Sequence, residues 1–151
     1  MTAVAIGRDW LTSRLPHRGT MNLLEVIVSW DRTTLHARAV SHRAPDNPLR
    51  RAGELSIACG IEYAAQAVAA HGALHAENET AGAGFLASVR SVTFHASRLD
   101  DVPGVLEIAV EQLASGSSGV LYDFCVSSAG RNLLVGRVAI ALDASRFSQP
   151  A

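Results

Sequence analysis

The sequence predicts an α+β protein in which an antiparallel sheet curls around one long helix. Three observations lead to this fold class. The stretch Leu55–Ala76 is apolar and nearly uncharged, has the length of a helix and contains no proline. Segments of alternating polar and apolar residues lie on both sides of it and are joined by short turns. Such turns imply antiparallel pairing, and only a curled sheet can cover a helix that is apolar on all sides.

The elements expected before the helix are a short helical turn, two strands and a polar loop: Asp9–Leu11, Met21–Trp30, Thr33–Ser41 and His42–Gly53. We place the helix at about residues 54–76. Glu54 suits its first turn, because a negative charge is favourable at a helix N-terminus.

Four further strands are expected after the helix: Phe85–Ser97, Val105–Leu113, Val120–Val126 and Leu133–Leu142. No linker, repeat or low-complexity segment interrupts the chain. Residues 1–151 are therefore expected to form a single domain.

Composition excludes several classes of protein. The chain has 151 residues, 48% of them hydrophobic, and a net charge of −1, so it is not a disordered tail and has no basic field for nucleic acid. The N-terminus lacks the apolar run of a secretion signal. Glu62 and Gln66 argue against a membrane span through the long apolar stretch. Two cysteines, Cys59 and Cys125, do not make a disulfide framework, and we expect a cytoplasmic protein.

Glu62 is the first candidate for a functional residue, because it lies within this apolar helix. An ionised carboxylate there needs a partner, or its pKa rises. The alternatives are a core carboxylate held by arginine or backbone donors, or a side chain that points outward at one helix end. Gln66 lies one helical turn further on the same face. It can orient the carboxylate or a substrate group, or it is an ordinary interfacial glutamine.

A sheet wrapped on one central helix is the hot-dog architecture, and several motifs resemble a family with this fold. The segments LPHR (Leu15–Arg18) and MNLLEV (Met21–Val26) resemble the N-terminal part of the 3-hydroxyacyl-[acyl-carrier-protein] dehydratases. The helix segment GIEYAAQA (Gly60–Ala67) is most similar to the dehydratase subfamily of aryl-polyene pigment clusters, where it reads GIEYMAQA. The run GFL (Gly84–Leu86), followed by Arg90, also matches that subfamily.

One departure from the wider family concerns the catalytic base. Typical members carry His-Phe-Pro-Gly before the helix, whereas this chain has NPLRRAG at Asn47–Gly53, and the subfamily generally lacks the motif too. The resemblance therefore carries the carboxylate over to Glu62 but assigns the histidine to no residue. His17, in the LPHR segment, is the strongest substitute; its alternative is a structural histidine bonded to backbone. His42 is a second candidate to face the site, although we favour an exposed loop histidine.

The remaining histidines and the cysteine on the helix suggest no further chemistry. His71 and His75 are expected near the C-terminal end of the helix, and His36 and His95 on strands, as surface or interface residues. They show no metal-ligand spacing, so we expect no metal and no cofactor. Cys59, among apolar neighbours, is expected to be packing and not a nucleophile.

The resemblance implies an enzyme that eliminates water from a 3-hydroxyacyl thioester. This reaction needs a base at C2, an acid at the C3 hydroxyl and donors for charge on the thioester carbonyl. Glu62 would be the acid and His17 the tentative base. Gln66, Gly53 and His42 are the candidate substrate-binding residues. Donors are expected from the helix N-terminus, and Gly53 would allow the substrate to approach the backbone.

The implied partners are an acyl carrier protein bearing a 3-hydroxyacyl chain and a second hot-dog subunit, in a homodimer or a heterodimer. The pathway would be fatty-acid-like or aryl-polyene biosynthesis. Two alternatives stay open. A hot-dog thioesterase would use the carboxylate to activate water and needs no histidine. A catalytically incomplete subunit would complete its site on a related partner.

Overall fold

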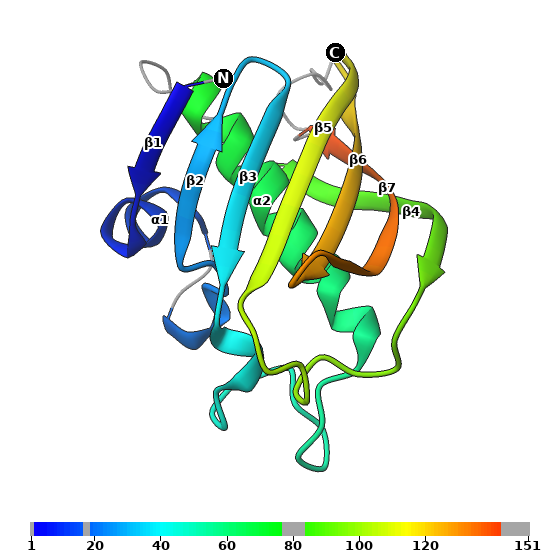
Figure 1. The fold of residues 1–151 in the computed structure, drawn as a ribbon. Coiled ribbons are helices and arrows are strands. Elements are labelled where there is room, and N and C mark those ends of the chain that lie inside the picture. Colours follow the sequence, from blue (N-terminus) through cyan, green and yellow to red (C-terminus); the bar gives the residue numbers. More distant parts are fainter. Residues whose placement is uncertain (1, 17–18, 77–83, 143–151) are drawn as a thin grey trace, which may run out of the picture.

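The computed structural model describes residues 2–16, 19–76 and 84–142. They form one antiparallel sheet of seven strands in the order β1-β2-β3-β5-β6-β7-β4, and the helix α2 (Gly60–His75) lies across one face of it (Figure 1). The strands are β1 (Thr2–Ile6), β2 (Val26–Trp30), β3 (Thr34–Ala39), β4 (Gly84–Phe94), β5 (Leu106–Gly116), β6 (Gly119–Ser128) and β7 (Arg131–Leu142). The predicted fold class is confirmed.

Short helices lie around this frame: α1 (Arg8–Arg14), and the 3-10 helices η1 (Gly19–Met21), η2 (Ser41–Arg43) and η3 (Ile57–Cys59). The predicted turn at Asp9–Leu11 is part of α1. Within the described residues, no helix combines the length and the apolar character that crossing a membrane requires.

The central helix begins later than the sequence predicts. Arg51 and Glu54 exchange two backbone hydrogen bonds and close a tight turn, in which Ala52 and Gly53 both have positive φ. The backbone N–H of Leu55 then donates to the Asp100 carboxylate at 2.8 Å. Because these residues are bonded elsewhere, helical structure starts only at η3, and Glu62 lies in the first turn of α2.

The chain before the second strand also differs from the prediction. The sequence predicts a strand over Met21–Trp30, but β2 begins at Val26. Residues 22–24 are buried and have neither helical nor strand structure. Their apolar side chains resemble those of a strand because they too point into the core. The strand β1, which pairs with β2, is missing from the sequence-based prediction.

The sheet covers only one side of α2. The covered side includes Tyr63, Ala64, Ala67 and Ala70, none of which is exposed, and the helix contacts β3, β5 and β6. Exposed or half-buried residues recur along the other side and its start in η3, with all steps of three or four except that from Ile61 to Glu62: Ala58, Ile61, Glu62, Ala65, Ala69 and Gly72. We call these residues the uncovered stripe. The sequence predicts complete coverage, but the curl of one sheet ends before it closes around the helix.

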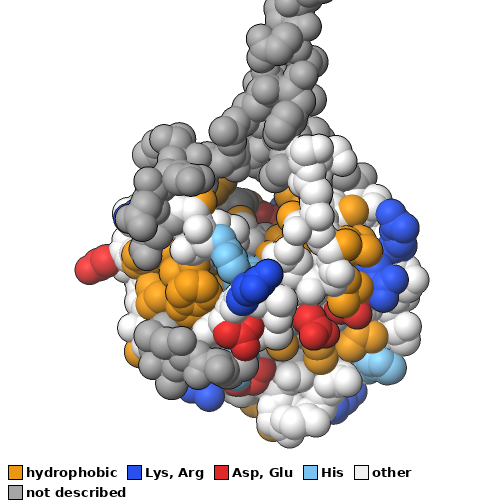
Figure 2. All heavy atoms as spheres, turned by 90° about the horizontal axis from the view of Figure 1, so that it is seen from above, with side chains coloured by type: hydrophobic (Ala, Val, Ile, Leu, Met, Phe, Trp, Pro, Cys, Tyr) orange, Lys and Arg blue, Asp and Glu red, His pale blue; other side chains and the backbone are white. Residues whose placement is uncertain are grey.

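Figure 2 shows the end of the molecule that is uppermost in Figure 1. Hydrophobic, basic and acidic side chains are interspersed on this face, and no single sign of charge dominates it. The face therefore lacks the concentrated positive field that steers binding to a polyanion.

Gly60 lies close against the sheet. A Cβ atom at Gly60 would lie 2.6 Å from a methyl group of Leu134, whose side chain is fully buried. We therefore expect Gly60→Ala to lower the free energy of unfolding by about 1–3 kcal/mol, through overpacking. Gly72→Ala is the control, since no atom lies within 4 Å of a Cβ there. It is expected to gain up to about 1 kcal/mol from helix propensity. Urea denaturation measures the free energy of unfolding of both variants. An equal change in the two variants would contradict the close contact at Gly60.

Candidate active site

Glu62 is half-buried and lies on the uncovered stripe, at the start of α2. Its Oε1 atom is 3.4 Å from the amide nitrogen of Gln66, one helical turn further on. The carboxylate thus stands at the border between the packed side of the helix and its uncovered side. This position combines partial desolvation with access from outside the chain, as an acid-base catalyst requires.

Gln66 is completely buried, and its amide bonds to the chain that precedes β2. Its Oε1 accepts from the N–H of Leu23 at 2.9 Å, and its Nε2 donates to the carbonyl of Met21 at 2.7 Å. These bonds and the contact to Glu62 would allow Gln66 to orient the carboxylate, and this role stays a prediction. Its role as a substrate ligand stays a prediction.

Tyr63, next to Glu62, is a second anchor for the same part of the chain. Its hydroxyl lies 2.8 Å from Ser41 Oγ, which donates its only proton to the carbonyl of Leu23, so the tyrosine donates to the serine. The amide of Asn47 donates to the tyrosine oxygen at 3.2 Å. Burial raises the pKa of Tyr63. The sequence offered no signal for this network, because its members lie far apart in the chain.

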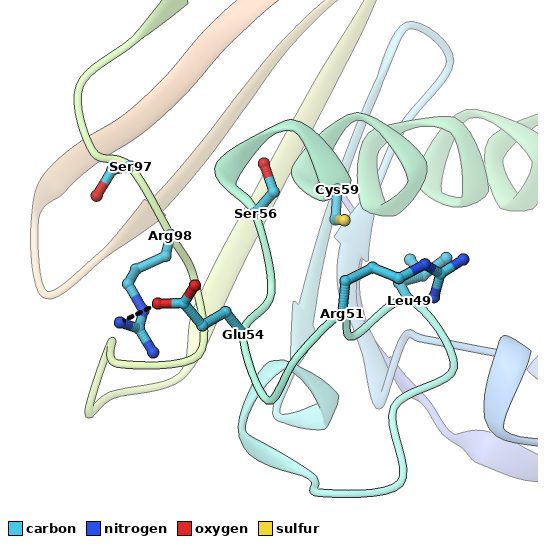
Figure 3. A pocket seen from close by; sticks show the side chains of 7 residues that line it. All are labelled: Leu49, Arg51, Glu54, Ser56, Cys59, Ser97 and Arg98. Atoms are coloured by element: carbon cyan, nitrogen blue, oxygen red, sulfur yellow. Dashed lines mark ion pairs between the residues drawn. The ribbon is translucent and has the colours of Figure 1, made fainter.

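A cavity of about 370 Å³ opens beside the N-terminal end of α2 (Figure 3). Its lining consists of Leu49, Arg51, Glu54, Ser56, Cys59, Ser97 and Arg98. Arg98 is paired with Glu54 at 2.6 Å and with the carboxylate of Asp100. Burial raises the pKa of the Cys59 thiol, which agrees with a packing role and not with a nucleophile. Cys59 precedes Glu62 by about one helical turn, and Glu62 itself does not line the cavity.

The first backbone N–H groups of the helical segment already donate hydrogen bonds within the chain, whereas the sequence suggests that they are free to bind a substrate. The N–H of Ile57 donates to Ser97, and that of Gly60 to the carbonyls of Ile57 and Ala58. The N–H groups of Ala58 and Cys59 both donate to Ser56, to its hydroxyl and its carbonyl. The expectation that these donors stabilise a thioester carbonyl is therefore wrong for residues 57–60.

Gly53 lies at the tip of the turn that leads into η3. It is exposed, its φ is +80°, and a Cβ atom there would meet nothing within 4 Å. The turn geometry explains the glycine without a ligand, because L-residues rarely adopt this backbone conformation. Substrate binding by Gly53 stays a prediction.

His42 is completely buried, so the favoured interpretation as an exposed loop histidine is wrong. Its Nε2 lies 3.1 Å from the carbonyl of Val102, whereas its Nδ1 has no partner among the described residues. Because a carbonyl only accepts, Nε2 carries the proton. Burial lowers the pKa of His42. It does not line the cavity near Glu62, and its role as a substrate ligand stays a prediction.

The other sequence-predicted histidines lie apart from Glu62 or outside the described residues. His17, the tentative base, falls outside the described residues. His36 is half-buried and paired with Glu107 at 2.8 Å, and His95 is exposed, as expected. Within the described part of the chain, His, Cys, Asp and Glu form no group of three or more that could hold a metal ion.

A buried polar network lies at the opposite end of α2 from Glu62. His71 is fully buried, with its Nε2 2.8 Å from the carbonyl of Asp31 and its Nδ1 2.6 Å from the hydroxyl of Tyr122. The carbonyl can only accept, so Nε2 carries the proton and Nδ1 accepts from the tyrosine. Burial lowers the pKa of His71 and raises that of Tyr122 to about 12. The neutral imidazole thus ties α2 to the β2–β3 connection and to β6.

The curled antiparallel sheet on one helix, with a half-buried glutamate at the start of that helix, defines a hot-dog protein. Solved structures agree with this fold. The dehydratase heterocomplex ApeI:P from Xenorhabdus doucetiae is 23% identical, with a TM-score of 0.79 over 88% of this chain and 90% of that one. A putative thioesterase from Silicibacter sp. TM1040 is 15% identical, with a TM-score of 0.65 over 95% of both chains. Zebra fish thioesterase superfamily member 2 is 11% identical, with a TM-score of 0.61 over 89% and 94% of the respective chains.

The family is shown by sequence. A family model described as ApeP dehydratase matches residues 11–148, and the chain therefore belongs to the ApeP-like dehydratase family. Among curated proteins, none matches the chain. The family membership confirms the resemblance to the aryl-polyene dehydratases and makes the protein a dehydratase, an enzyme that eliminates water.

The buried histidines predict a loss of stability in acid. The pKa of His71 is lowered in the folded chain, so below its ordinary value of 6.5 the unfolded chain binds more protons. The stability is therefore complete above about pH 6.5 and falls as the pH drops, with a slope of at most about 1.4 kcal/mol per pH unit for one proton. We expect His71→Gln to flatten this slope in urea titrations between pH 8 and pH 5. His36→Gln, at a half-exposed position, should leave the dependence of stability on pH as steep as in the parent chain. An unchanged slope in His71→Gln would contradict the buried neutral ring.

Proposed function

We propose that the chain supplies the catalytic carboxylate of a two-subunit dehydratase that acts on 3-hydroxyacyl thioesters of acyl carrier protein. The pathway proposed is fatty-acid-like or aryl-polyene biosynthesis in the cytoplasm. The chain forms a single domain, and its partner is a second hot-dog subunit. The dehydratase from Xenorhabdus doucetiae, which is similar over most of its length, is itself a heterocomplex.

One observation carries the proposal: Glu62 lies on the uncovered stripe of α2. The stripe is apolar apart from Glu62, and its C-terminal half consists of the small residues Ala65, Ala69 and Gly72. Small side chains allow a second helix to approach closely. A partner on this stripe would bury the apolar surface and remove the Glu62 carboxylate from water. Burial in such an interface favours the protonated acid.

The reaction requires two proton transfers, one to the C3 hydroxyl and one from C2, and each is made by a different group. Protonated Glu62 donates its proton to the C3 hydroxyl, which leaves as water when the C3–O bond breaks. A base removes the C2 proton, and the electrons of that C–H bond form the C2–C3 double bond. The product is the enoyl thioester, and Glu62 regains its proton in the next cycle.

The base is proposed to be a histidine, either His17 of this chain or a histidine of the partner subunit. A nitrogen base suits the C2 proton, because imidazole exchanges protons near neutral pH. The cavity beside Cys59 is proposed to accept the thioester arm, because it opens one helical turn from Glu62. The exposed side chain of Arg51 gives its rim a positive charge.

Replacement of the carboxylate tests the role of Glu62. Glu62→Gln keeps the shape of the side chain but cannot transfer a proton. We expect turnover of a 3-hydroxyacyl carrier substrate, measured by enoyl absorbance with the partner present, to fall by a factor on the order of hundreds. Unchanged turnover in a well-folded variant would exclude Glu62 as the acid. Free thiol is recorded in the same assay, and its release without enoyl formation would identify a thioesterase instead.

Blocking the stripe tests the partner. Ala69 is exposed in the C-terminal half of the stripe, and Ala69→Arg places a long charged side chain there. We expect this variant to fold as the parent chain does, to lose co-purification with the partner and to lose most of its activity. Ala109→Arg, at an exposed position on β5, is the matched control and should retain both. Retained association in Ala69→Arg would place the interface elsewhere.

A further inference from the structure

Side-chain hydrogen bonds fix the chain that leads from the end of η1 toward β2. Each carbonyl from Met21 to Leu24 accepts a hydrogen bond from a side chain at 2.7–2.8 Å. Gln66 donates to the first, Ser41 to the third, and Arg8 to the second and the fourth. We call residues 21–24 the held segment.

This arrangement is unusual for buried chain. Buried peptide groups normally pair with other peptide groups in helices or sheets, and irregular segments normally run over the surface. Here Asn22, Leu23 and Leu24 are all at most 2% exposed, yet they belong to no helix or strand. Donors from α1, η2 and α2 therefore fix the path of the segment from three directions. A displacement of one of these donors would therefore act directly on the segment.

Gln66 connects the held segment to the carboxylate. The same amide nitrogen that donates to Met21 lies 3.4 Å from Glu62 Oε1, and the amide oxygen accepts from Leu23. A shift of the held segment must turn this amide, and the turned amide displaces its second hydrogen away from Glu62. The position of the carboxylate thus depends on donors that do not touch it.

We propose that Arg8 is a positioning residue for the dehydration reaction, acting through the held segment and Gln66 on Glu62. One nitrogen, Nη1, donates to both Asn22 and Leu24 at 2.7 Å, so a single guanidinium fixes two of the four carbonyls. The inference rests on the proposed role of Glu62. It assigns to α1, far from Glu62 in sequence, a part in catalysis.

The test compares two arginines that both donate to backbone carbonyls. Arg8→Met keeps the apolar stem and removes the guanidinium. Arg43→Met is the matched control, because Arg43 Nη1 donates to the carbonyl of Pro103 at 2.8 Å and does not contact the held segment. The variants are assayed with the partner subunit. In Arg8→Met we expect kcat to fall about tenfold with KM unchanged, as for other residues that orient a catalytic group.

Two readouts separate positioning from general stability. Hydrogen exchange at the Leu23 amide, which donates to Gln66, should speed up in Arg8→Met and not in Arg43→Met. The limb of the pH–rate profile that Glu62→Gln abolishes should move in Arg8→Met only, and Arg8→Lys should restore part of kcat. Equal kcat in the two methionine variants, or a loss that follows thermal stability alone, overturns the inference. If Glu62→Gln is itself fully active, the proposed function fails first, and the exchange result still reports on the held segment.

Discussion

Helix α2 has more apolar surface than the sheet covers, and the organisation of the site depends on this excess. Tyr63, Ala67 and Ala70 are buried against the sheet, which supplies the hydrophobic stabilisation of the chain itself. Ala65 and Ala69, equally apolar, remain outside that contact. Contiguous apolar surface of this kind usually belongs to an interface. Glu62 lies where the two surfaces meet, so packing within the chain acts on this carboxylate, and the proposed partner would act on the same group.

The fold was predictable wherever the pattern of residues reflects local geometry. Alternation along β5 and β6 marks which side chains face the core, and the long uncharged run marks α2. The pattern fails where distant contacts decide the backbone. Leu55 leaves the helix because its N–H bonds to Asp100, and no periodicity in the sequence contains that information. The held segment was predicted as a strand for the same reason: burial gives it strand-like residues, while side chains replace the neighbouring strand.

The candidate site was predictable to the extent that it lies on one helix. Glu62 and Gln66 are one turn apart, so their contact follows from spacing alone. The groups that hold Gln66 in place come from elsewhere. Arg8 and Ser41 reach the held segment from other elements, and their roles depend on tertiary contacts. The burial of His42 was likewise hidden, since its polar neighbours in the sequence indicate an exposed loop while the folded chain covers it completely.

The two surfaces of α2 differ in how firmly they are fixed, and this difference has a catalytic meaning. On the packed side, Gln66 and Tyr63 are tied to backbone and hydroxyl groups, so the orientation of Glu62 is set before any partner arrives. On the uncovered side, Ala58, Ala69 and Gly72 are exposed, and Ile61, Glu62 and Ala65 are only half-buried. The contacts that orient Glu62 thus belong to the single chain, whereas in the proposed function its further desolvation would come from the second chain. A carboxylate acid needs both, because proton transfer depends on geometry as well as on the protonated form being populated. In that proposal, the support around Gln66 prepares the glutamate of a chain that lacks the usual histidine motif.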